Sequence, residues 1–311
     1  MTRPKLLVLI ALSDAGRRAI TARFDVVSAP DPASRASVIA GRGAEFDLVL
    51  TNGTVGLSAA EIDALPNLRL AGALGAGYEN LAVDHARQRG VVVVNGAGTN
   101  DDCVADHAFG LLLAAARGLN HLDHLCRQGV WRDALPMPPN VSGKRLGLLG
   151  LGNIGGKIAR RAAGFDMPIG YHTRHRRAES PYAYFDTVHD LASWCEFLVV
   201  ATPGGASTRH MVETTVLRAL GPQGFLVNIA RGSVVDTQAL AAALRDGTIA
   251  GAGLDVYESE PSPPAELLAF PNVVLTPHMA GRSPEALQAS VQCFLDNVER
   301  HLAGQPVLTP V

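Results

Sequence analysis

The stretch Gly150-Leu151-Gly152-Asn153-Ile154-Gly155 decides the fold of this chain. It follows an apolar run, residues 145–149, that is typical of a buried strand, and it precedes residues 156–163, which are typical of a helix. In this context G-x-G-x-x-G indicates a dinucleotide site: Gly150 allows the tight turn, Gly152 admits a pyrophosphate, and Gly155 lets helix and strand pack closely. The free N–H groups at the helix start would face the phosphates. The alternative is a tight strand-to-helix turn in some other α/β protein.

Length, composition and net charge limit the number of domains and the classes of partner that this chain can have. The chain has 311 residues, which suits about two domains, and 47% of them are hydrophobic. A net charge of -2 gives no indication of a nucleic acid or a membrane surface as partner, and no apolar run approaches the ~18–20 residues of a membrane span. The apolar residues 6–12 continue into charged sequence and predict a first strand and helix rather than a signal peptide. The four cysteines are scattered without a C-x-x-C pair, so we expect free thiols, a cytoplasmic protein and no metal site.

Short apolar runs alternate with segments of helical length or turn character along the whole chain. Before the glycine motif the predicted strands are residues 6–10, 47–51, 69–74 and 91–95, and after it they are 167–171, 197–201, 225–229, 251–256 and 273–276. Such alternation predicts parallel sheets covered by helices. One long helix is expected over about 100–130, with surface histidines at 107, 121 and 124, and another over 283–302. The turn Leu74-Gly75-Ala76-Gly77 is either an anion-binding nest of N–H groups or a plain turn.

The end of the second strand after the glycine motif points to the form of the cofactor. An NAD site usually has an acid about 20 residues after the glycines, where it binds the ribose hydroxyls. Here the strand runs into His172-Thr173-Arg174-His175-Arg176-Arg177, and no acid follows until Glu179. Arginine forms charge-assisted bonds to a 2′-phosphate, so we predict NADP(H) in preference to NAD(H), with Thr173 and Arg174, and after them His175 and Arg176, as phosphate ligands. The alternative is a solvated basic loop.

Three chemically active residues follow three later strands. Arg231, Glu260 and His278 would all lie at the rim formed by the carboxyl ends of a parallel sheet, where ligands bind in open α/β folds. Histidine is a suitable proton donor near neutral pH, and a neighbouring glutamate would orient it and raise its pKa. Arginine can clamp a carboxylate and polarise a carbonyl. Together they suit hydride transfer to the carbon of a keto acid, with His278 supplying the proton.

From about residue 45 to the end, the chain resembles the D-isomer-specific 2-hydroxyacid dehydrogenase family. The matching stretches are Leu74-Gly75-Ala76-Gly77-Tyr78-Glu79-Asn80, Val104-Ala105-Asp106-His107, the glycine motif, Asn228-Ile229-Ala230-Arg231-Gly232, Leu254-Asp255-Val256-Tyr257-Glu258-Ser259-Glu260-Pro261 and Thr276-Pro277-His278. The resemblance implies two Rossmann-like, doubly wound domains. The dinucleotide-binding domain (100–281) is expected to be inserted in a discontinuous, flavodoxin-like substrate domain (1–99 and 282–311).

The resemblance also implies site residues and an assembly. Arg231, Glu260 and His278 would be catalytic, and Leu74, Gly75, Ala76, Gly77 and Arg231 would bind substrate, with Arg282 added as a candidate from this sequence alone. The implied cofactor-binding set is Gly150, Gly152, Asn153, Ile154, Gly155, Thr173, Arg174, His175, Thr202, Pro203, Ile229, Ala230, Arg231, Asp255, His278 and Gly281. A homodimer is expected, with the helix near residue 110 in its interface.

Several alternatives stay open at this level. Within the family the basic loop resembles NADPH-using glyoxylate/hydroxypyruvate and hydroxyphenylpyruvate reductases, so aromatic 2-ketoacids and 2-ketogluconate compete with small substrates. A cofactor-sensing protein similar to the corepressors of the family is the alternative of a different class. Arg282 departs from the family pattern and would either meet a second polar group of the substrate, cap a helix or face solvent. Trp131 would line a pocket or contact a second subunit.

Overall fold

The computed structural model describes residues 3–311, and contacts divide the chain into two compact units. Unit 1 comprises residues 1–100 and 281–311, and unit 2 comprises residues 101–280. Each unit is built around one parallel sheet. The prediction of two doubly wound α/β domains, one inserted in the other, is therefore confirmed.

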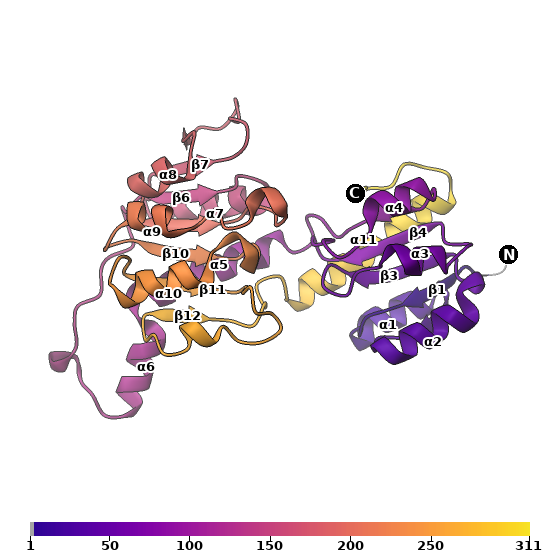
Figure 1. The fold of residues 1–311 in the computed structure, drawn as a ribbon, viewed down its shortest axis with the longest axis horizontal. Helices are drawn as coiled ribbons and strands as arrows, with labels where there is room; N and C mark the ends of the chain where they lie inside the picture. The colour runs from indigo at the N-terminus through magenta and orange to yellow at the C-terminus, as the bar shows by residue number, and fades with distance from the viewer. Residues whose placement is uncertain (1–2) are drawn as a thin grey trace. The chain divides into compact units, whose positions relative to one another are not determined.

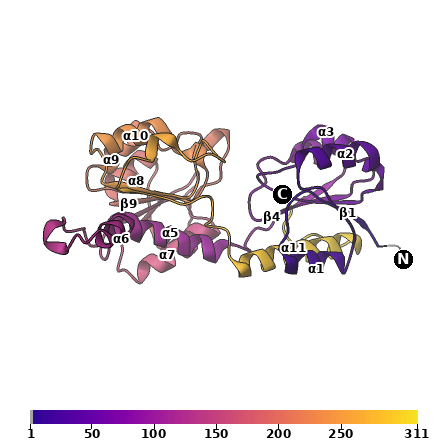
Figure 2. The ribbon, with the colours of Figure 1, turned by 90° about the horizontal axis from the view of Figure 1, so that it is seen from below.

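Unit 1 has a five-stranded sheet in the order β2-β1-β3-β4-β5, which is the flavodoxin-like order. Its strands are β1 (Lys5–Val8), β2 (Asp25–Ser28), β3 (Leu48–Asn52), β4 (Leu70–Leu74) and β5 (Val92–Val94). Its helices are α1 (Asp14–Thr21), α2 (Pro32–Arg42), α3 (Ala59–Asp63), α4 (Val83–Gln88) and α11 (Pro284–Leu302). Figure 2 shows α1 and α11 on one face of this sheet and α2 and α3 on the other.

The last helix joins the end of the chain to unit 1. Helix α11 packs on β4, where Gly72 has no side chain and the ring of Phe294 takes the space that a Cβ would need. The side chain of Asn297 is fully buried and accepts hydrogen bonds from the N–H groups of Leu308 and Thr309. The chain end therefore returns to the sheet that its first hundred residues form.

Unit 2 has a seven-stranded parallel sheet in the order β12-β11-β10-β9-β6-β7-β8. Its strands are β6 (Leu146–Leu149), β7 (Ile169–His172), β8 (Ala183–Tyr184), β9 (Phe197–Val200), β10 (Phe225–Asn228), β11 (Gly251–Leu254) and β12 (Val273–Leu275). Its helices are α5 (Asp101–Arg117), α6 (Leu119–Arg127), α7 (Asn153–Ala163), α8 (Val188–Trp194), α9 (Thr214–Leu220) and α10 (Thr237–Arg245). Helices α5 and α7 cover one face and α8, α9 and α10 the other (Figures 1 and 2).

The central strands of unit 2 are buried on both sides, which explains why their sequences are continuous apolar runs. The order of the sheet reverses between β6 and β9. At such a switch point the loops that leave neighbouring strands run to opposite faces and open a crevice at the carboxyl ends of the strands. Gly150, directly after β6, lies at this position.

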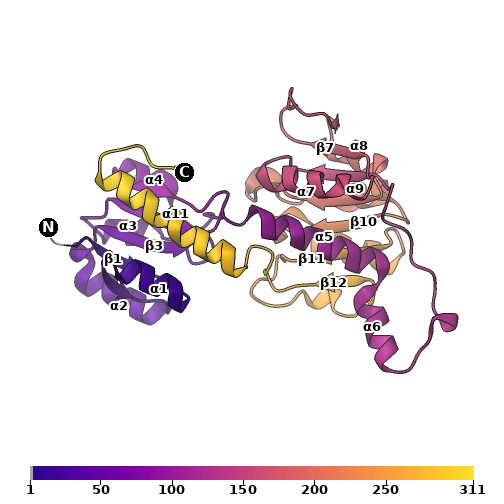
Figure 3. The same cartoon turned by 180° about the vertical axis from the view of Figure 1, so that it is seen from behind.

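Two sequence predictions about secondary structure were wrong. The single helix expected over about 100–130 is broken at Gly118, whose φ of 60° is left-handed, and α6 therefore leaves the axis of α5. Figure 3 shows α6 and the segment after it extending away from the sheet of unit 2. Strands β2 and β8 were not predicted, because both are short edge strands without a buried apolar run.

Candidate functional site

The glycine motif forms a turn that fits a pyrophosphate. Gly150 has a φ of 107°, and a Cβ on Gly155 would lie 2.3 Å from the carbonyl oxygen of Gly150, so neither position accepts a side chain without movement. Gly152 precedes α7, and a Cβ built there would have no neighbour within 4 Å. The first N–H groups of α7 have no partner within the helix. The open space over Gly152 and these N–H groups suit the diphosphate of a dinucleotide.

The turn after β9 adjoins the glycine motif. A Cβ on Gly150 would lie 2.6 Å from the carbonyl oxygen of Ala201 and 2.9 Å from the N–H nitrogen of Thr202. The predicted cofactor residues Thr202 and Pro203 therefore follow the strand on the other side of the switch point, next to the motif. Thr202 is half-buried and Pro203 is exposed.

The basic loop after β7 has exposed cations. Arg174, His175 and Arg176 are exposed, and no ion pair of Arg174 or Arg176 is found in residues 3–311. Thr173 Oγ1 donates a hydrogen bond to the carbonyl oxygen of His175 at 2.7 Å. Because a hydroxyl has one proton, Thr173 would have to release this bond to donate to a phosphate. The two arginines are the better candidates for an anionic group at this strand end.

In unit 1 the predicted substrate loop follows β4. Gly75 has a φ of 83°, and its carbonyl oxygen accepts from the N–H of Gly96 at 2.7 Å. The carbonyl oxygen of Ala76 accepts from the side-chain amide of Asn95 at 2.8 Å. The N–H groups of Ala76 and Gly77 have no acceptor in the described part of the chain. The loop thus turns its carbonyls inward, and its free donors remain available to an anion.

Arg231 is held by a turn that needs two glycines. The side chain of Asn228 bonds both sides of the turn, accepting from the N–H of Ala230 and donating to the carbonyl oxygen of Arg231, each at 3.0 Å. A Cβ on Gly232 would lie 1.9 Å from the carbonyl carbon of Tyr257, so glycine lets the segment that leads to Glu260 pass beside this turn. A Cβ on Gly204 would lie 2.7 Å from Arg231 Cγ. These glycines bring the arginine and the acidic segment together.

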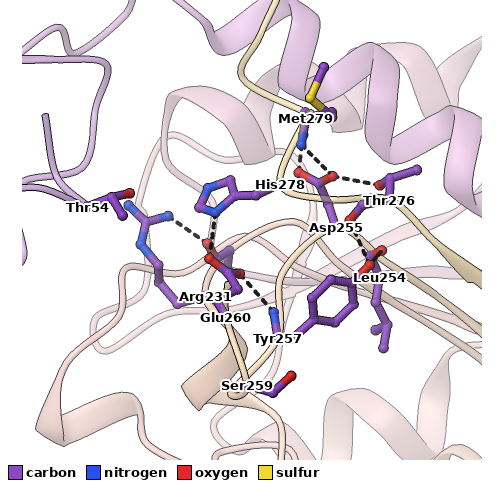
Figure 4. A network of polar contacts seen from close by, with 12 residues as sticks. Thr54, Arg231, Leu254, Asp255, Tyr257, Ser259, Glu260, Thr276, His278 and Met279 are labelled. Carbon is purple, nitrogen blue, oxygen red and sulfur yellow. Dashed lines mark hydrogen bonds and ion pairs between the residues drawn. The ribbon is translucent and has the colours of Figure 1, made fainter. Parts of the chain in front are cut away.

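His278 and Glu260 form a hydrogen-bonded pair, and Arg231 points toward them (Figure 4). His278 Nδ1 lies 2.9 Å from Glu260 Oε2, and Glu260 Oε1 accepts from the N–H of Tyr257 at 2.9 Å. The side chains of His278 and Glu260 are 43% and 32% exposed. The bond to the carboxylate fixes the histidine with its proton on Nδ1 and leaves Nε2 free to act on a ligand.

Opposing effects set the pKa values of this pair. The hydrogen bond to Glu260 raises the pKa of His278 above its ordinary value, and the charge of Glu260 adds to this, while burial and the charge of Arg231 oppose it. Burial by itself would raise the pKa of Glu260, but the bonds from His278 and from the Tyr257 N–H, with the charges of His278 and Arg231, lower it. The ionised glutamate therefore favours the protonated form of the imidazole.

Asp255, expected beside the cofactor, is 1% exposed and bonds to the chain that follows His278. Its Oδ1 accepts from the N–H of Met279 and its Oδ2 from the N–H of Ala280, both at 2.8 Å, and Thr276 Oγ1 donates to Oδ1 at 2.6 Å. Burial would raise the pKa of Asp255, but the bonds from His107, Thr276 and these two N–H groups lower it. The carboxylate is ionised, and both of its oxygens serve the turn that carries His278.

The remaining predicted residues differ in burial. Ile229 and Ala230 are buried at the end of β10. Gly281 is half-buried and Arg282 is exposed, and both belong to unit 1. Arg282 is exposed and does not cap α11, because the side chain of Ser283 accepts from the N–H of Ala286 in that role. Asn153, Ile154 and Gly155 of the glycine motif form the start of α7, and Gly152 is its N-cap.

Sequence reasoning missed His107 as a site residue. It was assigned to the surface, but its Nε2 lies 2.8 Å from Thr276 Oγ1 and its side chain is 26% exposed. It falls three residues after Val104 and four before Leu111, on the apolar face of α5. That spacing was the signal for an inward-facing histidine.

The assembled groups fit one chemistry. The arginine can bind and polarise an anionic or carbonyl oxygen, and the histidine can give a proton to an oxygen that gains negative charge. No group of His, Cys, Asp and Glu side chains in residues 3–311 has the arrangement of a metal site. Within the same residues, no helix is long and apolar enough to cross a membrane.

Comparison with known proteins identifies relatives for this fold and site. Residues 109–280 match the family model described as D-isomer specific 2-hydroxyacid dehydrogenase, NAD binding domain. The hydroxyphenylpyruvate reductase of Plectranthus scutellarioides is 40% identical over 264 residues, which cover 85% of this chain and 84% of that protein. The 2-ketogluconate reductase of Gluconobacter oxydans is 38% identical over 264 residues, 85% of either chain.

A solved structure extends the similarity to the whole chain. The NADPH-dependent glyoxylate/hydroxypyruvate reductase of Sinorhizobium meliloti, crystallised in complex with NADP and malonate, superimposes with a TM-score of 0.91 at 38% identity. The match covers 100% of this chain and 97% of that one. A nicotinamide dinucleotide is accordingly the class of cofactor for which unit 2 is built.

Proposed function

Because the chain belongs to the D-isomer specific 2-hydroxyacid dehydrogenase family, we propose that it uses NADPH to reduce a 2-ketoacid of the glyoxylate/hydroxypyruvate type to the D-2-hydroxyacid. The observation that carries this proposal is the pair of His278 and Glu260, whose 2.9 Å hydrogen bond raises the pKa of the imidazole and so favours the proton that reduction requires. Aromatic 2-ketoacids and 2-ketogluconate are the alternative substrates, since relatives of similar identity are named for both.

In this proposal the three catalytic side chains divide the work. Arg231 binds the carboxylate and the keto oxygen of the substrate, which orients it and polarises the carbonyl. His278 holds a proton on Nε2 and donates it to the keto oxygen as negative charge develops there. Glu260 stays ionised throughout. It stabilises the imidazolium before the transfer and keeps the ring oriented after it. The nicotinamide, when bound, supplies the hydride for the keto carbon.

The loop after β4 is proposed to recognise the substrate carboxylate. Its N–H groups at Ala76 and Gly77 have no acceptor in the described residues, and the bonds from Gly96 and Asn95 hold its carbonyls away. Such a turn stabilises a carboxylate without a second buried cation. Leu74 and Gly75 complete this loop, and Arg282 is a further candidate for a polar substituent on the substrate.

The preference for NADPH rests on the loop after β7. Arg174 and Arg176 are exposed and have no ion pair in residues 3–311, and no acid lies between Thr173 and Ala178. Guanidinium groups favour a 2′-phosphate, and a carboxylate at this position would repel one. The cofactor's diphosphate is assigned to the turn Gly150–Gly155, next to Thr202 and Pro203.

We propose a homodimer formed through the region of α5 and α6. None of the residues of α6 is buried, and the apolar side chain of Leu119 on this helix is 50% exposed. Beyond the helix, Trp131 and Met137 are 69% and 96% exposed. A projecting segment with exposed large apolar side chains is typical of a subunit interface. The proposed compartment is the cytoplasm, in keeping with four cysteines that form no disulfide within residues 3–311.

The test is a set of initial rates with NADPH and with NADH on glyoxylate, hydroxypyruvate, phenylpyruvate and 2-ketogluconate. The proposal expects turnover with NADPH and one of the two small substrates as the best by kcat/KM. A best substrate among the other two would replace the substrate assignment, and a higher kcat/KM with NADH would refute the cofactor preference. Tight binding of NADPH with no turnover of any substrate would contradict the enzymatic function and favour a cofactor sensor.

A further inference from the structure

The turn that carries His278 has an unusual backbone. His278 has a φ of 53°, in the left-handed region that side-chain-bearing residues rarely adopt. Its N–H donates to the carbonyl oxygen of Asp255 at 2.8 Å, and the next two N–H groups, those of Met279 and Ala280, donate to the Asp255 carboxylate. A single aspartate thus holds three successive residues of this turn.

Asp255 is itself held from a different element. Thr276 Oγ1, at the end of β12, lies 2.6 Å from Asp255 Oδ1 and 2.8 Å from Nε2 of His107, which belongs to α5 (Figure 4 shows the threonine and the aspartate). His107 Nε2 also lies 3.4 Å from Asp255 Oδ1. The three side chains therefore form a chain of polar contacts that begins on the helix and ends at the turn of His278.

The direction of each hydrogen bond follows from the number of protons. Asp255 is ionised and can only accept, so the single proton of the Thr276 hydroxyl goes to Asp255. The hydroxyl oxygen must then accept from His107, which requires a proton on His107 Nε2. The donor role of His107 is thus fixed by its neighbours, and a side chain without an N–H would leave the threonine and the buried aspartate with one donor fewer.

We propose that His107 is a positioning residue of the active site: its Nε2–H, through Thr276 and Asp255, holds the turn 278–280 so that the His278 ring meets Glu260 and the substrate. This inference rests on the proposed reductase function for its kinetic consequences. Its structural part, that His107 determines how His278 is presented to Glu260, can be tested without turnover. His107 acts through other residues and is assigned no contact with substrate.

The experiment compares full-length variants that keep or remove the donor. His107→Leu removes the N–H, His107→Gln keeps an N–H at the position of Nε2, and Thr276→Val removes the relaying hydroxyl with little change of shape. His189→Leu is the matched control, because His189 lies on α8 with a side chain 58% exposed. Each protein is assayed for kcat and KM of the best ketoacid at saturating NADPH, and its melting temperature is recorded.

A second readout follows His278 directly. Histidine labelled with ¹³C at Cε1 is titrated by NMR in the cofactor-free protein, and the His278 signal is assigned by its loss in His278→Ala. If the turn loosens, the hydrogen bond from His278 Nδ1 to Glu260 weakens, and the His278 midpoint falls toward the ordinary value for histidine. This shift reports the position of the ring even in a protein without activity.

We expect His107→Leu and Thr276→Val each to lower kcat about tenfold or more, since small misplacements of a catalytic group have effects of this size. KM for the ketoacid stays near wild type, the His278 midpoint falls, and His107→Gln recovers most of both losses. The double variant His107→Leu/Thr276→Val should be little worse than either single change, because both interrupt the same path.

The opposite results are equally specific. Values of kcat within twofold of wild type and an unshifted His278 midpoint in His107→Leu would overturn the proposal. Equal damage from His107→Gln and His107→Leu would also overturn it, because shape rather than the donor would then matter. If His107→Leu does not fold, Thr276→Val decides by the same two readouts. A wild-type protein without turnover would refute the proposed function, whereas the NMR titration would still judge the role of His107.

Discussion

Replacing Glu260 by glutamine should move the alkaline limb of the pH–rate profile for ketoacid reduction to lower pH. The amide oxygen can still accept from His278 Nδ1, which keeps the ring oriented, while the amide nitrogen then faces the N–H of Tyr257, so the change removes the charge and one backbone hydrogen bond. Reduction requires the protonated imidazole, and Glu260 raises the pKa of His278. The wild-type rate therefore persists to higher pH than that of an unassisted histidine, and Glu260→Gln loses this extension.

The magnitude follows from the geometry of the pair. A hydrogen bond to a charged group contributes about 1.5–3 kcal/mol when well protected, and an exposed ion pair about 0.2–1 kcal/mol. The two side chains here are 43% and 32% exposed at a separation of 2.9 Å, which places the contribution of the charge at about 1 kcal/mol, between the two cases. On the alkaline limb this corresponds to about a fivefold loss of kcat/KM, with little loss on the acidic plateau.

The assay is kcat/KM for the best ketoacid between about pH 5 and pH 10 in a buffer series of constant ionic strength, a window that brackets histidine titration. Glu266→Gln is the control, since Glu266 is an acid of the same loop region whose side chain contacts Gln238 and not the histidine. It changes the net charge by the same amount and should leave the profile unchanged. A Glu260→Gln profile with the wild-type alkaline limb would mean that Glu260 does not determine the protonation of His278.

Three further predictions test the other parts of the site. His278→Ala should lower kcat by orders of magnitude while the Kd of NADPH, measured by fluorescence titration, stays near wild type; retention of most of kcat would exclude this histidine as the acid. Arg174→Ala should raise KM for NADPH about tenfold or more and leave KM for NADH unchanged, and a parallel rise in both would remove the arginine from 2′-phosphate recognition. Gly155→Ala should lower the free energy of unfolding by about 1–3 kcal/mol, because its Cβ would meet the Gly150 carbonyl oxygen at 2.3 Å. Gly152→Ala should keep the wild-type Tm and weaken NADPH binding, because its Cβ has no neighbour within 4 Å and its φ is -83°. Equal losses of Tm in the two variants would refute this division.

The sequence predicted the class of fold because its signals are local. The buried strands β6, β9 and β10 are continuous apolar runs, and the glycine motif lies between a strand and a helix, so short windows contain the information. Edge strand β2, with an exposed residue at each end, has no such run and was missed. The break at Gly118 was also missed, since a glycine inside an apolar periodic segment is compatible with a continuous helix until its φ is known.

Residues with obvious chemistry could be selected from sequence, because arginine, glutamate and histidine at strand ends are visible in a linear reading. The residues that hold these side chains in place could not be selected in this way. Gly204 and Gly232 matter because of Arg231 and Tyr257, side chains and backbone that come from other strand ends. His107 was assigned to the surface because its partner, Thr276, lies 169 residues away. Contacts at such separations leave no periodic signal.

The strained turn at His278 explains why these remote contacts matter to the chemistry. A left-handed conformation at a residue other than glycine costs about 1–3 kcal/mol and persists where the surroundings over-determine it. At His278 the surroundings are three hydrogen bonds to Asp255, one to its carbonyl oxygen and two to its carboxylate. Asp255 is 1% exposed and stays ionised because Thr276 and His107 donate toward it. The hydrogen bonds that offset the strain at His278 therefore depend on a buried carboxylate, which in turn depends on its own donors. Removal of any of these donors should therefore displace the imidazole of His278 before it disturbs the sheet of unit 2.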